Sequence, residues 1–338
     1  MINLVTLAII VIAVALIFDF LNGVNDAANA IATIVITRAV TPLQAVFMAA
    51  AANFAGVFIF GVAIATTIGK GIIDINYITV PLILAALIGA IIWNVLAWFR
   101  GLPISCSHTL VGGLIGSAIA SAGWKSVMFG EVSKISAFII VAPLLGMLGA
   151  IIFTTLIFWL CRRVQPSVTN KLFRRLQLVS AAAYSLGHGT NDAQKTMGII
   201  AITLYAANLT DSFHISLWII LSCYTAIALG TACGGWRVVR TMGTGLLKIR
   251  PLEGFSAETS SALVLLGTAH LGIPVSTTHV IAGAICGVGT VEGAAKVRWV
   301  TARKIVWAWI LTIPATAFCG WAAYHLISLL AHAGLFNF

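Results

Sequence analysis

The sequence predicts an all-α polytopic membrane protein, with two inverted repeats, about ten transmembrane helices and two re-entrant helical hairpins. Three observations lead to this fold class. Charged residues are scarce, apolar blocks are long enough to cross a bilayer, and two polar motifs occur in the same order in both halves of the chain.

Composition identifies the solvent as lipid. Of the 338 residues, 60% are hydrophobic and only 8% are charged, whereas a soluble domain carries about a quarter charged residues. A crossing needs about 20 apolar residues, so roughly ten spans fit and no sizeable soluble domain is left over. The N-terminal residues lack a basic region and a small-residue cleavage site, so we expect a retained first membrane segment rather than a removed signal peptide.

The net charge of +10 indicates membrane orientation rather than nucleic acid binding. The basic residues cluster in short loops between apolar blocks, which is the distribution of cytoplasmic loops in the cell membrane. The six cysteines are scattered without metal-ligand spacing, so we expect neither disulfides nor zinc, and no cofactor. The oligomeric state stays open, a homodimer included.

Apolar blocks alternate with polar interruptions along the chain. The stretches that Gly, Asn, Ser and His interrupt are expected to leave the helix, which is tolerated at membrane depth only where protein buries the backbone or a wet cavity adjoins it. A basic connector near the midpoint divides the chain into a first repeat (1–161), a short cytoplasmic linker (162–176) and a second repeat (177–338). The apolar blocks are 4–22, 43–68, 78–99, 135–160, 213–232 and 304–331, and the interrupted stretches are 23–36, 101–121, 184–208 and 257–290.

Two motif pairs establish the repeat. Residues 23–27 read Gly-Val-Asn-Asp-Ala and residues 189–193 read Gly-Thr-Asn-Asp-Ala. Residues 101–108 read Gly-Leu-Pro-Ile-Ser-Cys-Ser-His, and residues 272–279 read Gly-Ile-Pro-Val-Ser-Thr-Thr-His. Duplicated halves with matching interruptions are typical of transporters, whose binding site lies where the repeats meet.

The basic clusters predict opposite orientations for the two hairpins. Clusters at 162–175, 237–250 and 296–304 are expected on the cytoplasmic side. The block 257–290 would then enter and leave on one face, as a re-entrant hairpin does. The equivalent block 85–121 has sparser basic flanks, which fits a hairpin that opens to the other side.

The Gly-x-Pro-x-Ser motifs predict an anion site. Proline disfavours helix in the residue before it, and Ser and Thr are preferred helix N-caps, so new helices should begin near 105–108 and 276–279. Two helix starts with adjacent hydroxyls would bind a tetrahedral oxyanion. Plain helix capping is the alternative, and the duplication favours function; the two histidines could bind substrate, carry a proton or fix the hairpins. The candidates are Ser105, Ser107, His108, Ser276, Thr277, Thr278 and His279.

The Asn-Asp pairs predict a cation or proton site. Carboxylates within membrane segments usually line ion pathways, and amide and carboxylate oxygens suit alkali cations. Alternatively, such an aspartate only pairs with a base such as Lys195, and Asp19 could lie on a supporting face. Glu258, beside an interrupted segment, is a candidate for cation binding or gating. The candidates are Asn22, Asn25, Asp26, Asn191, Asp192 and Glu258.

These motifs resemble the signature of the PiT family of inorganic phosphate transporters. The similarity lies in residues 18–30, 188–193, 254–258 and 274–279, hence in both halves. It implies inverted repeats with re-entrant hairpins, cation-coupled phosphate uptake, phosphate between the hairpin Ser and Thr residues, and cations near the Asn-Asp pairs. Two departures are Cys106, where the family has a hydroxyl, and a short central linker.

Charge predicts coupled transport. Moving one negative charge into a cell costs about 2.3 kcal/mol per 100 mV, so a phosphate dianion needs sodium or protons as partners. Asp26 and Asp192 would hold those cations while the two halves alternate access. The alternatives are a symporter of sulfate or of a metal–phosphate complex, and a passive anion channel. An intramembrane hydrolase using Ser105 or Ser276 is disfavoured because the site is duplicated, so no enzyme is expected.

Overall fold

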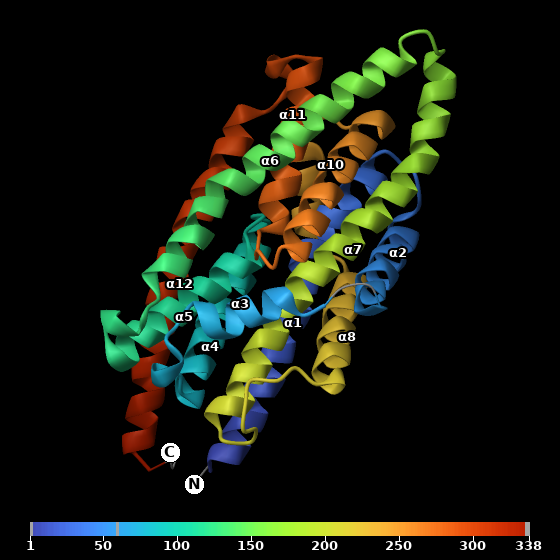
Figure 1. The fold of residues 1–338 in the computed structure, drawn as a ribbon. Helices are drawn as coiled ribbons and strands as arrows, with labels where there is room; N and C mark the ends of the chain where they lie inside the picture. The colour runs from blue at the N-terminus through green and yellow to red at the C-terminus, as the bar shows by residue number, and fades with distance from the viewer. Residues whose placement is uncertain (1–2, 59–60, 335–338) are drawn as a thin grey trace.

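The computed structural model describes residues 3–58 and 61–334, and α-helices dominate them. Across those ranges the structure contains no β-strand, only an isolated bridge between Ile73 and Val127. Figure 1 shows the longest helices lying roughly along one long axis, shorter helices crossing it, and both ends of the chain at the same end of the molecule. The α-helices are α1 (Leu4–Ile36), α2 (Pro42–Ala55), α3 (Ala63–Gly71), α4 (Val80–Arg100), α5 (Cys106–Ala122), α6 (Phe129–Cys161), α7 (Pro166–Ala206), α8 (Leu217–Cys233), α9 (Trp236–Gly245), α10 (Pro251–His270), α11 (Thr277–Glu292) and α12 (Trp299–His332).

Several helices are suited to cross a bilayer, which makes the chain an integral membrane protein. By length and composition, α1, α4, α6 and α12 qualify, and the bent pairs α2–α3 and α8–α9 bring the total to six in the described part. The predicted number of about ten spans stays a prediction. The apolar block 43–68 is not one straight element, because a 3₁₀ turn at Gly56–Phe58 separates α2 from α3.

The expected breaks at 23–36 and 184–208 are wrong. Residues 23–36 are continuous helix inside α1, and residues 184–206 are continuous helix inside α7. Asp26, Asp192 and Asn191 contact other elements through their side chains, and the backbone of both stretches keeps its own helical hydrogen bonds. Their glycines permit close packing: a Cβ on Gly23 would lie 2.2 Å from the Ile227 carbonyl oxygen, and one on Gly189 would lie 2.5 Å from that of Asn53.

The expected breaks at the Gly-x-Pro motifs are confirmed. Helix α4 ends at Gly101, which adopts the left-handed φ of 63°, and α5 begins after the N-cap Ser105. In the second half α10 ends before Gly272, with φ of 67°, and α11 begins after the N-cap Ser276. Each motif therefore turns the chain sharply and starts a new helix, so that α4 and α5 form the first hairpin, α10 and α11 form the second, and the two motifs are the hairpin tips.

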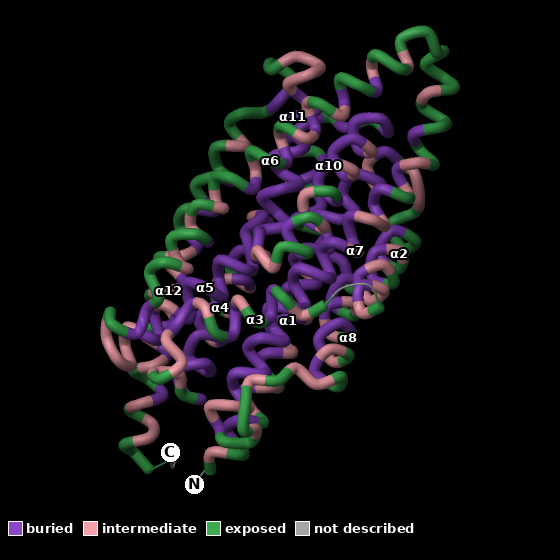
Figure 2. Tube along the Cα trace, in the orientation of Figure 1, coloured by how far each residue is buried: buried purple, intermediate pink, exposed green. Residues whose placement is uncertain are grey.

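The two halves repeat the same order of elements and interlock. Two long helices, α6 and α12, close the halves, and each packs against the short hairpin helix of the other half, α6 against α11 and α12 against α5. Exposed residues lie along α6 and α12, whereas buried residues fill the inside around α7, α10 and α11 (Figure 2). The segment 162–176, predicted as a linker, is a short turn followed by the first part of α7.

Candidate functional site

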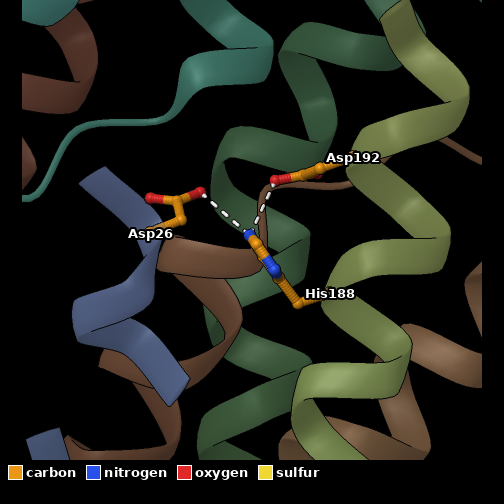
Figure 3. A group of neighbouring side chains, drawn as sticks. All are labelled: Asp26, His188 and Asp192. Atoms are coloured by element: carbon orange, nitrogen blue, oxygen red, sulfur yellow. Dashed lines mark ion pairs between the residues drawn. The ribbon is translucent and has the colours of Figure 1, made fainter. Parts of the chain in front are cut away.

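The two Asn-Asp motifs bring a pair of buried carboxylates together at the centre of the protein. Asp26 on α1 and Asp192 on α7 both face the imidazole of His188 (Figure 3). The Nε2 atom of His188 lies 3.3 Å from Asp192 and 3.7 Å from Asp26, and its Nδ1 lies 3.1 Å from the Asn53 side-chain oxygen. Ligand atoms of the three residues lie within 4.8 Å of one another, which is close enough to share one metal ion.

Two threonines at the start of α11, in the second hairpin, contact the two carboxylates. The Thr277 hydroxyl lies 3.2 Å from an oxygen of Asp26 and 3.5 Å from one of Asp192, and Thr278 donates to Asp26 at 3.1 Å. Thr278 also contacts the Ile104 carbonyl oxygen of the first hairpin at 3.2 Å. The hairpin tips and both aspartates therefore form one polar centre.

A buried lysine also belongs to this centre. The Lys195 ammonium donates to Asp192 and to the hydroxyl of Ser107, and it lies 3.1 Å from the Val275 carbonyl oxygen. The expected alternative of an ion pair with Lys195 thus applies to Asp192. Asp26, among the described residues, has no lysine or arginine partner.

The two hairpin histidines contact each other. The rings of His108 and His279 meet edge to face with centroids 4.8 Å apart, and His279 stacks on Trp309 at 3.8 Å. Their side chains are buried, and neither nitrogen of His279 has a hydrogen-bond partner within the described part of the chain. The Ser105 and Ser276 hydroxyls accept from the backbone N–H groups of His108 and His279, as helix caps do.

The asparagines of the motifs have different surroundings. Asn191 donates to the carbonyl oxygens of Gly187 and Leu265, and Asn25 lines a cavity of about 210 Å³ together with Val24 and Asn94. The side-chain oxygens of Asn22, Asn29 and Asn191 are buried and have no partner among residues 3–58 and 61–334. Free amide oxygens beside a carboxylate are the ligands that an alkali cation takes.

Glu258 belongs to a second polar cluster. Its carboxylate accepts hydrogen bonds from Thr33 on α1 and from Ser180 and Gln177 on α7, the last at 3.2 Å. Gln177 in turn accepts from Thr37 at 2.8 Å. Through this cluster α10 is hydrogen-bonded to α1 and α7, the two helices that carry the Asn-Asp motifs.

Several residues of these clusters were not predicted as site residues, and Lys195 was predicted only as the alternative ion-pair partner of a motif aspartate. His188 and Lys195 are spaced i−4 and i+3 from Asp192, which places all three on one helix face and was the available signal. Thr33, Gln177 and Ser180 carry no such signal, because only packing brings them to Glu258. Asp19 is buried, and both its carboxylate oxygens lack hydrogen-bond partners in the described segments.

Fold and site together define a class: a membrane transporter whose hairpin tips meet buried ionisable residues at its centre. Buried polar groups in discontinuous helices between duplicated halves are the usual architecture of a secondary transporter's site. Residues 22–320 match the Phosphate transporter family, and the chain belongs to that family.

Similar proteins agree with this assignment over nearly the whole chain. A probable low-affinity inorganic phosphate transporter of Rhizobium meliloti (strain 1021) is 48% identical over 95% of this chain and 96% of its own length. One from Bacillus subtilis (strain 168) is 41% identical, covering 97% and 99%. A solved structure of a sodium-dependent phosphate transporter superimposes with a TM-score of 0.88 at 27% identity, covering 96% of this chain and 99% of that chain. The protein is thus a transporter of the cell membrane and not an enzyme.

Proposed function

We propose that this protein carries inorganic phosphate across the cell membrane in symport with sodium or protons, by alternating access. The observation that carries the proposal is the meeting of the second hairpin tip with the carboxylates of Asp26 and Asp192, to which Lys195 links Ser107 of the first hairpin tip. Family membership and the phosphate transporters among its relatives support phosphate as the substrate.

Phosphate would bind between the two hairpin helix starts. The candidate donors are the N–H groups at the beginnings of α5 and α11 and the side chains of Ser107, Thr277 and Thr278. A helix start stabilises an anion through its free N–H groups and its dipole. The ring contact between His108 and His279 supports a shared site, because it holds the two helix starts together.

Cations would bind at the Asn-Asp motifs. A phosphate dianion and two buried carboxylates repel one another, so a cation must neutralise the carboxylates before phosphate enters. Moving a dianion inward against 100 mV costs about twice 2.3 kcal/mol, which the accompanying cations cancel. The two halves would then rock about the fixed site.

Uptake into proteoliposomes tests this function. Radiolabelled phosphate is supplied with a sodium gradient, a proton gradient or neither, with excess sulfate as competitor. Accumulation that one gradient drives and sulfate leaves unchanged is the expected result. Equilibration without accumulation would identify a channel, and inhibition by sulfate would identify a carrier of another oxyanion.

One observation favours a second substrate form, a metal–phosphate complex. Asp26, His188 and Asp192 together offer the oxygen and nitrogen ligands that a divalent cation takes. Uptake of phosphate that stops on chelation and resumes with magnesium or manganese would establish this form.

A further inference from the structure

Lys195 is a buried cation that the proposed transport cycle does not use. Its side chain is 2% exposed, and its ammonium contacts oxygens from three elements, the Asp192 carboxylate, the Ser107 hydroxyl and the Val275 carbonyl. An ammonium has three N–H groups, so these contacts use all of its donors. Carboxylate, hydroxyl and carbonyl oxygens are also the ligands that a bound alkali cation takes.

The internal repeat shows what stands at the same place in the first half. Aligning Gly23-Val24-Asn25-Asp26-Ala27 with Gly189-Thr190-Asn191-Asp192-Ala193 pairs Lys195 with Asn29. Both residues lie three positions after the motif aspartate, on the same face of their helix. The first half therefore has a neutral amide where the second half has a positive charge.

The amide of Asn29 is only partly satisfied. Its nitrogen donates to the Thr278 hydroxyl at 2.9 Å, and Thr278 also donates to Asp26. Its oxygen is buried and has no partner in the described residues, and the same is true of the Asn22 oxygen one turn before Asp26. In the second half the Asn191 oxygen is likewise open, but the Lys195 ammonium fills the place that matches the open acceptor of Asn29.

We propose that Lys195 is a tethered cation that occupies the second half's cation position, so that free coupling cations bind only in the first half, beside Asp26. The inference rests on the proposed function, which supplies the need for cations at both aspartates. Asp192 is neutralised by the protein itself, and fewer free cations are required per phosphate than two equivalent Asn-Asp sites would take.

Replacing the tethered cation with the first half's residue tests the idea. Binding of radiolabelled sodium to the purified full-length protein is measured at equilibrium for the wild type and for Lys195→Asn. The variant is expected to bind one more sodium ion per protein, and its half-maximal phosphate uptake should need more sodium than that of the wild type, because a free cation then takes the place of the ammonium. Lys195→Met, which fills the space without offering an oxygen, should bind no additional sodium.

Unchanged sodium binding in Lys195→Asn would overturn the proposal. Weaker phosphate binding without an extra sodium would make Lys195 a phosphate ligand instead. Lys195→Gln retains an amide oxygen with longer reach; if both amide variants fail to fold even in high sodium, the lysine is structural and the proposal is likewise overturned. Wild-type phosphate uptake, measured in parallel, tests the proposed function separately.

Discussion

The polar cluster around Glu258 and its counterpart in the first half differ completely in chemistry. Counted back from the hairpin tips at Gly101 and Gly272, Glu258 corresponds to Leu87. The partners of Glu258 are Thr33, Gln177 and Ser180. In the motif alignment their counterparts are Ile199, Val11 and Val14. Ile199 and Val11 are buried with Leu87 in one apolar core, and Val14 is partly buried against it.

This difference shows that a duplicated fold need not carry duplicated chemistry. In the inverted arrangement that the sequence predicts, matching clusters would lie toward opposite faces of the membrane. The Glu258 cluster would then provide a polar route from the central site, and the apolar cluster would seal the opposite side.

The largest effect is expected at the motif aspartates. Asp192→Asn should leave Lys195 buried without its carboxylate and destabilise the protein by about 3–5 kcal/mol, whereas Asp26→Asn removes no partner of a lysine. Thermal unfolding in detergent measures the difference, and both variants should lose cation-dependent uptake. Lys195→Met in the Asp192→Asn background should restore much of the stability. Equal destabilisation by the two single variants would show that the ion pair with Lys195 does not distinguish Asp192 from Asp26 in stability.

Exchanging polarity between the matched clusters should destabilise both. Glu258→Leu leaves the Ser180, Thr33 and Gln177 donors buried without their acceptor, which costs about 1–3 kcal/mol for each unsatisfied group. Leu87→Gln buries an amide among apolar side chains at a similar cost of about 1–3 kcal/mol. Chemical denaturation provides the measurement, with Glu258→Gln as the control because it retains an acceptor. Wild-type stability in Leu87→Gln would mean that the first-half cluster is already hydrated.

The hairpin helices should respond alike in the two halves, because here the packing is the same. A Cβ on Gly112 would lie 2.6 Å from the Ile313 carbonyl oxygen, and one on Gly283 would lie 2.1 Å from that of Pro143. Alanine at either position should therefore cost about 1–3 kcal/mol through overpacking. Gly267→Ala, with nothing within 4 Å of its added Cβ, is the matched control and should not destabilise. A loss confined to one half would contradict equivalent packing.

The smallest effect is expected at Cys106, the counterpart of Thr277. Cys106→Ser changes only the size and polarity of one buried atom, and a substitution of nearly equal volume costs below about 1.5 kcal/mol. Uptake should therefore stay within about tenfold of wild type. Thr277→Cys, which removes a hydroxyl that contacts both Asp26 and Asp192, should reduce uptake more. The comparison fails if the two substitutions have equal effects.

The sequence by itself determined that the protein lies in lipid as an integral membrane protein, and where its two hairpin tips lie. Because charged residues are scarce, most of the protein surface must face lipid. The proline shortly before Ser105 and Ser276 breaks the helix, and each serine starts a new one. The doubled motifs also identified the aspartates that the structure places together. These features could be predicted because each depends on composition or on a few consecutive residues.

Tertiary structure alone decided which polar residues meet, and whether their helices stay intact. The Asn-Asp stretches look like interruptions, yet α1 and α7 continue through them, and threonines of α11 contact both aspartates. Tertiary packing also brings Ser107 to the lysine that pairs with Asp192, and it brings residues of α1 and α7 to Glu258. Such contacts join residues far apart in the chain, and burial makes unsatisfied polar groups costly, so the fold and not the local sequence determines them.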